Sequence, residues 1–160
     1  MTKFDEFCDS FWVGKAKTEE GCLEREDELR RLPVAVSQVL QRMCSFLQCP
    51  EGHVHYVDLE TNAVAGTVES SLPPISFDHK RGRNIIGLEI RLGERPSRNQ
   101  YPVWLRFEFV PIKHGGLEFQ VGPDLFQVPE EEEKFFSRVA EAINHSLRQG
   151  YTAPTRTIVF

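Results

Sequence analysis

The hydrophobic period of this chain changes between residues 49 and 53, and this change restricts the possible folds more than any other feature. Upstream, apolar residues recur every three or four positions, whereas from His53 onward they alternate with polar residues. The first period is typical of amphipathic helices and the second of half-buried strands. Residues 1–50 are therefore predicted to be helical, and residues 53–128 to form a sheet.

The first helical pattern places four aromatic residues and a cysteine on one stripe of a short helix, which is predicted to end at Gly14. They are Phe4, Phe7, Cys8, Phe11 and Trp12. An aromatic stripe must be buried against something. Burial in the core of the protein is the expected outcome, and docking on a second copy is the alternative.

The second helical pattern begins at Leu23, with a break and restart predicted at Pro33, because proline fits the first turn of a helix but not its interior. After Pro33 the apolar residues follow a regular helical period: Val36, Val39, Leu40, Met43, Phe46 and Leu47. This segment is predicted to be a central buried helix that packs across one face of the sheet.

Five segments of the second part have the strand period, and mostly short connections join them. They are Val54–Leu59, Ala63–Val68, Ile85–Leu92, Val103–Val110 and Leu117–Val121. Short connections join neighbouring antiparallel strands. The prediction is an antiparallel β-meander of about five strands.

Alternation assigns each residue of the last three strands to a face of the sheet. One face is apolar and is predicted to form the core: Ile86, Leu88, Ile90, Leu92, Val103, Leu105, Phe107, Phe109, Leu117, Phe119 and Val121. The other face is mixed: Glu89, Arg91, Trp104, Arg106, Glu108, Glu118 and Gln120. Paired charges that solvate an open sheet and a surface that recognises a partner both explain such a face.

A last helix is predicted over residues 129–150, with four glutamates in its first turn, where acids complement the helix dipole. The tail, residues 151–160, has strand propensity and is predicted to add an edge strand to its own sheet or to that of a partner. The chain is thus predicted to be a single α+β domain, residues 1–160. Its N-terminal helices and C-terminal helix would pack on one face of the sheet.

The chain has 160 residues, a formal net charge of −5 and a hydrophobic content of 40%, as expected for one soluble domain. No stretch approaches the roughly 18 to 20 consecutive apolar residues of a membrane-spanning helix, so no membrane is expected. The first residues are acidic where a secretory signal would be basic, and a cytoplasmic location is expected. The cysteines are accordingly expected to stay reduced.

Charge is unevenly distributed, because residues 79–114 hold eight basic and three acidic residues within an acidic chain. Six of these bases are arginines: Arg81, Arg83, Arg91, Arg95, Arg98 and Arg106. Arginine makes planar, bidentate contacts with carboxylates and phosphates. These side chains would either neutralise acidic helices of the same chain or bind an anionic partner.

No motif identifies a catalytic, metal or nucleotide site. Four residues of zinc-ligand types lie close together in the sequence: Cys44, Cys49, His53 and His55. Their spacing matches no zinc motif, so no metal and no other cofactor is expected. Ser70–Ser71 has no identifiable base, and the basic turn Lys80–Arg83 lacks the glycines of a phosphate-binding loop. An enzyme is the less favoured expectation.

We therefore expect a small acidic protein-binding module, chaperone-like or immunity-like, whose mixed sheet face binds an acidic surface of another protein. The residues expected to make this contact are Arg81, Arg83, Arg91, Trp104 and Arg106. One alternative is a small-ligand protein or enzyme with a pocket between sheet and helices. Another, disfavoured by the acidic total, is a nucleic-acid binder that uses the central arginines.

Self-association is a further expectation. One route uses the aromatic stripe Phe4, Phe7, Phe11 and Trp12. The other uses the tail residues Thr155, Ile158 and Phe160.

Overall fold

The computed structural model describes residues 2–93, 101–150 and 156–160, with the side chains of these residues except those of 19–29, 156 and 159. The chain divides into two units, Met1–Leu32 and Pro33–Phe160, and each is described by itself. None of the helices in the described ranges is long and apolar enough to cross a membrane.

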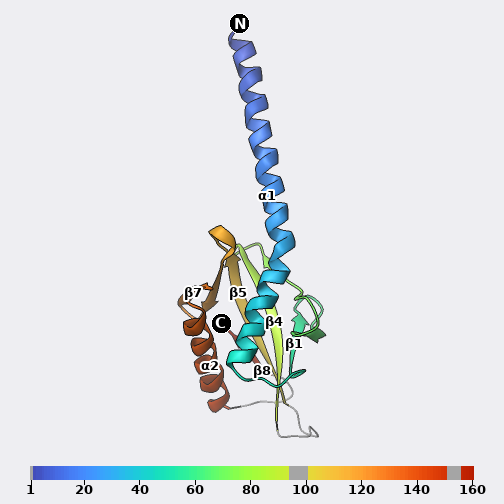
Figure 1. The fold of residues 1–160 in the computed structure, drawn as a ribbon, viewed down its shortest axis with the longest axis vertical. Helices are drawn as coiled ribbons and strands as arrows, with labels where there is room; N and C mark the ends of the chain where they lie inside the picture. Colours follow the sequence, from blue (N-terminus) through green and yellow to red (C-terminus); the bar gives the residue numbers. More distant parts are fainter. Residues whose placement is uncertain (1, 94–100, 151–155) are drawn as a thin grey trace. The chain divides into compact units, whose positions relative to one another are not determined.

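The second unit has the predicted α+β architecture, drawn in Figure 1. Helix α1 spans Lys3–Phe46, and its residues from Pro33 onward belong to this unit. The strands are β1 (Val54–Asp58), β2 (Ala63–Thr67), β3 (Ser76–Asp78), β4 (Arg83–Leu92), β5 (Tyr101–Pro111), β6 (Leu117–Val121), β7 (Asp124–Val128) and β8 (Arg156–Val159). A 3-10 turn, η1 (Lys113–Gly115), precedes β6, and helix α2 spans Glu132–Arg148.

The described strands form one eight-stranded sheet, which confirms the predicted α+β fold with an antiparallel sheet and enlarges that sheet. The strand order departs from a simple meander, because β1 and not β2 pairs with β4. The strand order is β2-β1-β4-β5-β6-β7, with β3 paired to β4 and β8 paired to β5. The β5–β8 pair is parallel, and all other pairs are antiparallel. Strands β3 and β7 were not predicted, because β3 has only three residues and β7 is mostly exposed and lacks a buried alternation.

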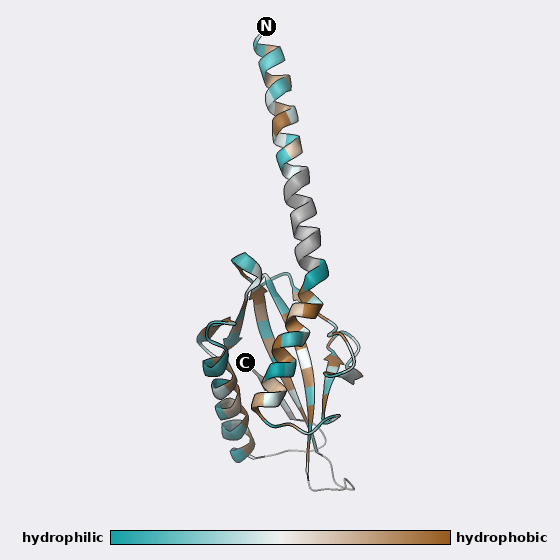
Figure 2. Ribbon diagram, viewed as in Figure 1, coloured by the Kyte–Doolittle hydropathy of each residue, from teal (hydrophilic) through white to brown (hydrophobic). Residues whose placement is uncertain are grey.

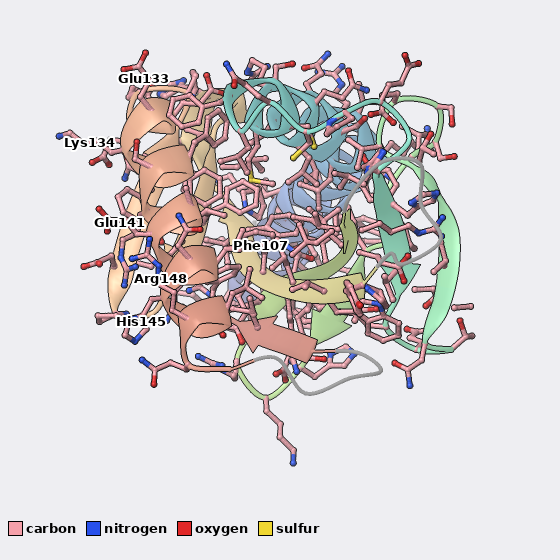
Figure 3. All side chains as sticks on the ribbon, turned by 90° about the horizontal axis from the view of Figure 1, so that it is seen from below. Phe107, Glu133, Lys134, Glu141, His145 and Arg148 are labelled. Carbon is pink, nitrogen blue, oxygen red and sulfur yellow. The ribbon has the colours of Figure 1, made fainter. Side chains whose placement is uncertain are left out.

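The predicted core face is confirmed, since Leu88, Phe107, Phe109 and Phe119 are buried together with Val39 of α1 and Phe136 of α2. Phe107 lies at the centre of an aromatic cluster (Figure 3). The Phe107 ring packs against three other rings at centroid distances of 4.7–6.4 Å: those of Phe119 in β6, Phe135 in α2 and Phe160, which follows β8.

Both helices of the second unit cover this apolar face. Phe46 near the end of α1 packs on Phe136 of α2 with ring centroids 5.6 Å apart, and Arg42 of α1 forms an ion pair with Glu132 of α2. Helix α2 is amphipathic because charged residues line the side away from Phe107, as Figure 3 shows for Glu133, Glu141 and Arg148. The sheet therefore has one face covered by helices and one face without them.

Two predicted helix ends are wrong, because α1 runs from Lys3 to Phe46 through both Gly14 and Pro33. A proline inside a helix removes one backbone hydrogen bond. Residues after Pro33 gain burial against the sheet, and Val36, Leu40 and Met43 are fully buried. This packing outweighs the local preference of proline. Helix α2 begins at Glu132, three residues after the predicted start.

The tail adds a strand to its own sheet, which is one of the two predicted alternatives. Strand β8 pairs with Val103–Arg106 of β5, and Ile158 and Phe160 are buried in the core. Their apolar surface is therefore used within the chain. Thr155 lies outside the described residues.

Truncation of Phe107 tests this account of the core. Phe107→Ala is expected to lower the free energy of unfolding by about 3–5 kcal/mol, because it removes a fully buried ring and leaves a cavity. Phe77→Ala is the control, since Phe77 is half exposed, and it should change stability by less than about 0.5 kcal/mol. Urea unfolding measures both. Equal effects of the two changes would contradict the assignment of faces.

Candidate functional site

The face of the sheet that the helices leave uncovered holds two buried carboxylates, and their surroundings define the candidate site. Glu108 of β5 is 2% exposed, and Glu89 of β4 is 6% exposed. A buried carboxylate is costly unless cations or hydrogen bonds compensate for the lost hydration. The partners of these two side chains therefore show how the arginines of this face are used.

Two arginines form ion pairs with the carboxylate of Glu108. Arg81 Nη1 donates a hydrogen bond to Glu108 Oε1 at 2.5 Å. Arg83 Nε lies 3.5 Å from Glu108 Oε2, within ion-pair distance but without a hydrogen bond. Arg81 lies in the turn between β3 and β4, and Arg83 is the first residue of β4. In this turn the Asp78 carboxylate accepts hydrogen bonds from the backbone N–H groups of Lys80 and Arg81.

One arginine and one indole donate hydrogen bonds to the carboxylate of Glu89. Arg91 Nε donates to Glu89 Oε1 at 2.7 Å, and Trp104 Nε1 donates to Glu89 Oε2 at 3.0 Å. Trp104 lies directly across from Glu89 in the β4–β5 register, so the sheet itself brings the two side chains together. Arg91 and Trp104 thus have partners within the chain.

Arg106 differs from these arginines. It is half-buried on β5 between Trp104 and Glu108, and its Nε atom is buried without a hydrogen-bond partner. Among the described residues, no carboxylate lies within ion-pair distance of Arg106. Arg83 also has buried nitrogens without hydrogen bonds, but it lies within ion-pair distance of Glu108, which it shares with Arg81. Arg106 is therefore an arginine of this face without an ion-pair partner in the described part of the chain.

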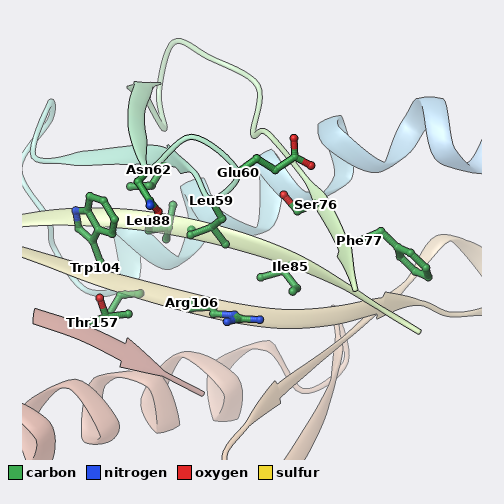
Figure 4. A pocket seen from close by; sticks show the side chains of 13 residues that line it. Leu59, Glu60, Asn62, Ser76, Phe77, Ile85, Leu88, Trp104, Arg106 and Thr157 are labelled. Atoms are coloured by element: carbon green, nitrogen blue, oxygen red, sulfur yellow. The ribbon is translucent and has the colours of Figure 1, made fainter. Parts of the chain in front are cut away.

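Arg106 lies in a groove of about 450 Å³ on this face, which we call the sheet-face groove (Figure 4). One wall comes from the β1–β2 hairpin with Leu59 and Asn62, and β3 contributes Ser76 and Phe77. Thr157 of β8 lies near Trp104 at one end. The groove combines apolar walls with hydroxyl and amide groups around a single cation.

Gly87 of β4 lies on the groove's floor and permits its close packing. A Cβ atom on Gly87 would lie 2.8 Å from Leu59 Cδ2 and 3.1 Å from the Val57 carbonyl oxygen. Since the shortest contact is with the end of the Leu59 side chain, any other residue here would require this side chain to shift.

The structure brings together only some of the predicted site residues. Trp104 and Arg106 line the sheet-face groove, whereas Arg81, Arg83 and Arg91 pair with buried glutamates. Arg95 and Arg98 lie outside the described residues. The residues that sequence reasoning missed are Leu59, Asn62, Ser76, Phe77 and Thr157. The only signal in the sequence was that these residues are small polar or apolar. No hydrophobic period or motif linked chain segments that lie so far apart.

His55 occupies the same face, opposite Glu89 in the β1–β4 register, and its buried Nδ1 atom has no hydrogen-bond partner in the described ranges. Burial lowers the pKa of His55 below its usual 6.5, and the positive charge of Arg91 lowers this pKa further. The negative charges of Glu89 and Glu69 oppose this shift without reversing it.

Acidification should therefore destabilise the protein through His55. The unfolded chain protonates His55 near pH 6.5, and the folded protein does so at lower pH. The free energy of unfolding must then fall as the pH drops below about 6.5. His55→Gln should reduce the loss of Tm between pH 7.5 and pH 5, measured by thermal unfolding. If the Tm of His55→Gln falls between pH 7.5 and pH 5 as much as that of the wild-type protein, the lowered pKa of His55 would be contradicted.

The cysteines of the α1 C-terminus form a second titratable group. The Cys44 thiol, a hydrogen-bond donor to the Cys49 sulfur, lowers the pKa of Cys49 to about 7. The same interaction, together with burial, raises the pKa of Cys44. In the part of the chain that the structure describes, no three His, Cys, Asp or Glu side chains are grouped to hold a metal ion.

This thiol pair predicts the reactivity of Cys49. In the native protein, alkylation of Cys49 by iodoacetamide should show a half-maximal rate near pH 7, because the thiolate is the nucleophile. Cys44→Ala should move this midpoint toward the usual thiol pKa of 9.0. Peptide mass spectrometry separates Cys49 from the exposed Cys8. The same midpoint in both proteins would show that Cys44 does not activate Cys49.

Comparison of the chain with protein-family models, with curated proteins and with solved structures found no match. Function is therefore inferred from the geometry of the site alone.

Proposed function

We propose that this protein is a binding module that takes an acidic side chain of a partner protein into the sheet-face groove. The observation that carries the proposal is Arg106, a half-buried cation with a buried, unpartnered Nε and no carboxylate within ion-pair distance among the described residues. A buried donor without a partner costs free energy. A carboxylate placed in the groove would supply both the missing acceptor and the missing negative charge.

The surroundings of Arg106 support a protein partner. Trp104 lines the groove, and Phe77 at its other end is 50% exposed. Arginine, tryptophan and other aromatic residues are enriched at the energetic centres of protein interfaces, and of these only arginine is not aromatic. The best-fitting occupant is thus a short segment in which one Asp or Glu is flanked by apolar residues.

The other charges of this face favour an anionic occupant over a cationic one. Two arginines share Glu108 and a third pairs with Glu89, so Arg106 adds positive charge to a region already balanced or positive. Glu60 lies at the groove but is exposed, and water screens its charge. A partner carboxylate would therefore meet a positive potential close to the guanidinium group.

A free carboxylate metabolite is the second candidate occupant, because the groove's volume of about 450 Å³ lies in the range of small-molecule sites. A catalytic reaction has less support. Of the described side chains that line the groove, only Glu60 and Arg106 are titratable, and neither activates a nucleophile there. Nucleic acid is disfavoured because the chain has a net charge of −5.

Peptide selection tests the proposal. Two phage libraries display eight-residue peptides with random flanks, one with Glu and the other with Gln fixed at a central position. The Glu library should be enriched on the wild-type protein and the Gln library should not. For a selected peptide, Arg106→Gln should weaken binding by about 10- to 100-fold, the value of a charge-assisted hydrogen bond. Fluorescence polarisation measures the Kd.

Arg138→Gln is the control, because Arg138 is likewise a partly exposed arginine but lies on α2, where it pairs with Asp124. It should leave peptide binding unchanged. Glutarate is titrated in parallel by calorimetry. Binding of glutarate as tight as that of the peptide would assign the groove to a small carboxylate ligand. Equal enrichment of both libraries, or no effect of Arg106→Gln, would overturn the proposal.

A further inference from the structure

The C-terminal cap of helix α1 brings two cysteines together. The helix ends at Phe46, and Gln48 has a left-handed conformation with φ 56°. The backbone N–H of Gln48 donates to the Ser45 carbonyl oxygen at 3.2 Å, and that of Cys49 donates to the Cys44 carbonyl oxygen at 3.0 Å. These two hydrogen bonds form a Schellman motif, in which the side chains joined by the longer of the two loops commonly touch. Here those side chains are the thiols of Cys44 and Cys49, which share a hydrogen bond.

The two thiols differ in their access to solvent. Cys44 is 7% exposed, whereas Cys49 is only half-buried. The negative charge of Glu69 raises the pKa of both cysteines, but the Cys44 hydrogen bond outweighs this effect at Cys49 and holds its pKa at about 7. Cysteines that react with peroxides are accessible, of low pKa and often next to a second cysteine that resolves the product. Cys49 fits the first role, and Cys44 fits the second.

Cys49 also lines a cavity of about 280 Å³ between the end of α1, the strands β4 and β5, and helix α2. In Figure 2 hydrophobic residues recur along β4 and β5 beside this end of α1. The lining is mostly apolar: Leu47, Ile90, Leu92, Val103, Ala140 and Ile143, with the amide of Asn144. This volume lies near the lower end of the range for small-molecule sites. The cavity therefore suits a small apolar molecule that reaches the Cys49 sulfur.

The chemistry of the pair limits what that molecule is. Of the described side chains that line the cavity, only the Cys49 thiol is titratable, so a reaction there must use the thiolate. Two neighbouring thiols together give up two electrons when they form a disulfide. A hydroperoxide accepts two electrons, and the apolar lining favours one with an apolar organic group.

We propose that Cys49 and Cys44 form a reactive dithiol that reduces an apolar organic hydroperoxide held in this cavity. The Cys49 thiolate attacks the terminal oxygen, so that a sulfur–oxygen bond forms and the oxygen–oxygen bond breaks. The alkoxide leaves and takes a proton from water, which gives an alcohol and leaves Cys49 as a sulfenic acid. The Cys44 sulfur then attacks the Cys49 sulfur, and the hydroxyl group leaves with the Cys44 proton as water. This inference is independent of the sheet-face groove.

Peptide mass spectrometry of the full chain tests the roles of the two cysteines. After brief treatment with cumene hydroperoxide at pH 7, the tryptic peptide of residues 43–80, which holds both cysteines and no other, should have lost two hydrogen atoms. In Cys44→Ala, dimedone should instead label Cys49 as a sulfenic acid. Cys8→Ser is the control, because Cys8 belongs to the first unit, and it should form the same disulfide. An unchanged peptide mass in the wild-type protein would overturn the proposal.

Reaction rates test the apolar ligand. The rates of Cys49 oxidation by cumene hydroperoxide and by hydrogen peroxide are each divided by the rate of free cysteine, which corrects for the intrinsic reactivity of each peroxide. The corrected rate should be about 10- to 100-fold higher for cumene hydroperoxide, as expected when apolar groups are buried in a fitting pocket. Equal corrected rates for the two peroxides in the wild-type protein would overturn the apolar ligand.

Filling the cavity gives an independent test. Ala140→Leu places a larger side chain in the cavity and should lower the rate with cumene hydroperoxide about tenfold, while the rate with hydrogen peroxide stays unchanged. Ala142→Leu is the matched control, because Ala142 is also half-buried on α2 but lines a different hollow. Thermal unfolding checks that both variants are folded. Equal effects of the two leucines would contradict binding in this cavity.

Discussion

Strand β5 lies at the centre of the second unit, and its pairing with β4 fixes the positions of most other groups. The two strands are in register from Asn84–Phe109 to Leu92–Tyr101. Because successive side chains of a strand point to opposite faces, the pairing that buries Phe107 under the helices also places Arg106 and Glu108 on the other face. A shift by one residue would exchange the aromatic core with the charged face, at a prohibitive cost in burial. The aromatic cluster thus positions the candidate site.

The face of the sheet that no helix covers shows how buried charged side chains are stabilised by their neighbours. Glu89 and Glu108 are buried there, and each is compensated by cations or an indole hydrogen bond from neighbouring residues. Such a network is stable only when its members are satisfied. Arg106 is the exception that has neither a carboxylate nor a full set of hydrogen bonds in the described part of the chain. An arginine beside a groove that lacks an ion-pair partner, as Arg106 does, is more informative about function than the excess of arginine in the sequence.

The two units offer different kinds of surface. The sheet-face groove combines one cation with polar groups and apolar walls, which suits a specific ligand of limited size. The first turns of α1 instead present a row of aromatic side chains along one helix. Phe4, Phe7, Phe11 and Trp12 are between 62% and 71% exposed, so the predicted burial of this stripe in a core is wrong within its unit. The groove is assembled from five segments of the chain, whereas the stripe is continuous in sequence. This difference explains why the stripe was recognisable from its spacing and the groove was not.

The sequence by itself determined the elements whose apolar pattern is regular and long enough to dominate. Alternation in β4, β5 and β6 predicted both faces correctly, and the helical period predicted the burial of Val36, Val39, Leu40 and Met43, because burial of one face is the main free-energy gain in each element. The same period placed Phe46 on the buried stripe, but Phe46 is 45% exposed at the end of α1. Tertiary structure alone decided the rest. The continuity of α1 through Pro33 depends on packing that local propensity does not contain. The parallel addition of β8, the approach of Leu59 to Gly87 and the choice of partners for each arginine depend on contacts between distant segments. A single sequence records residue types, but which charge finds a partner and which does not is settled only when the chain is folded.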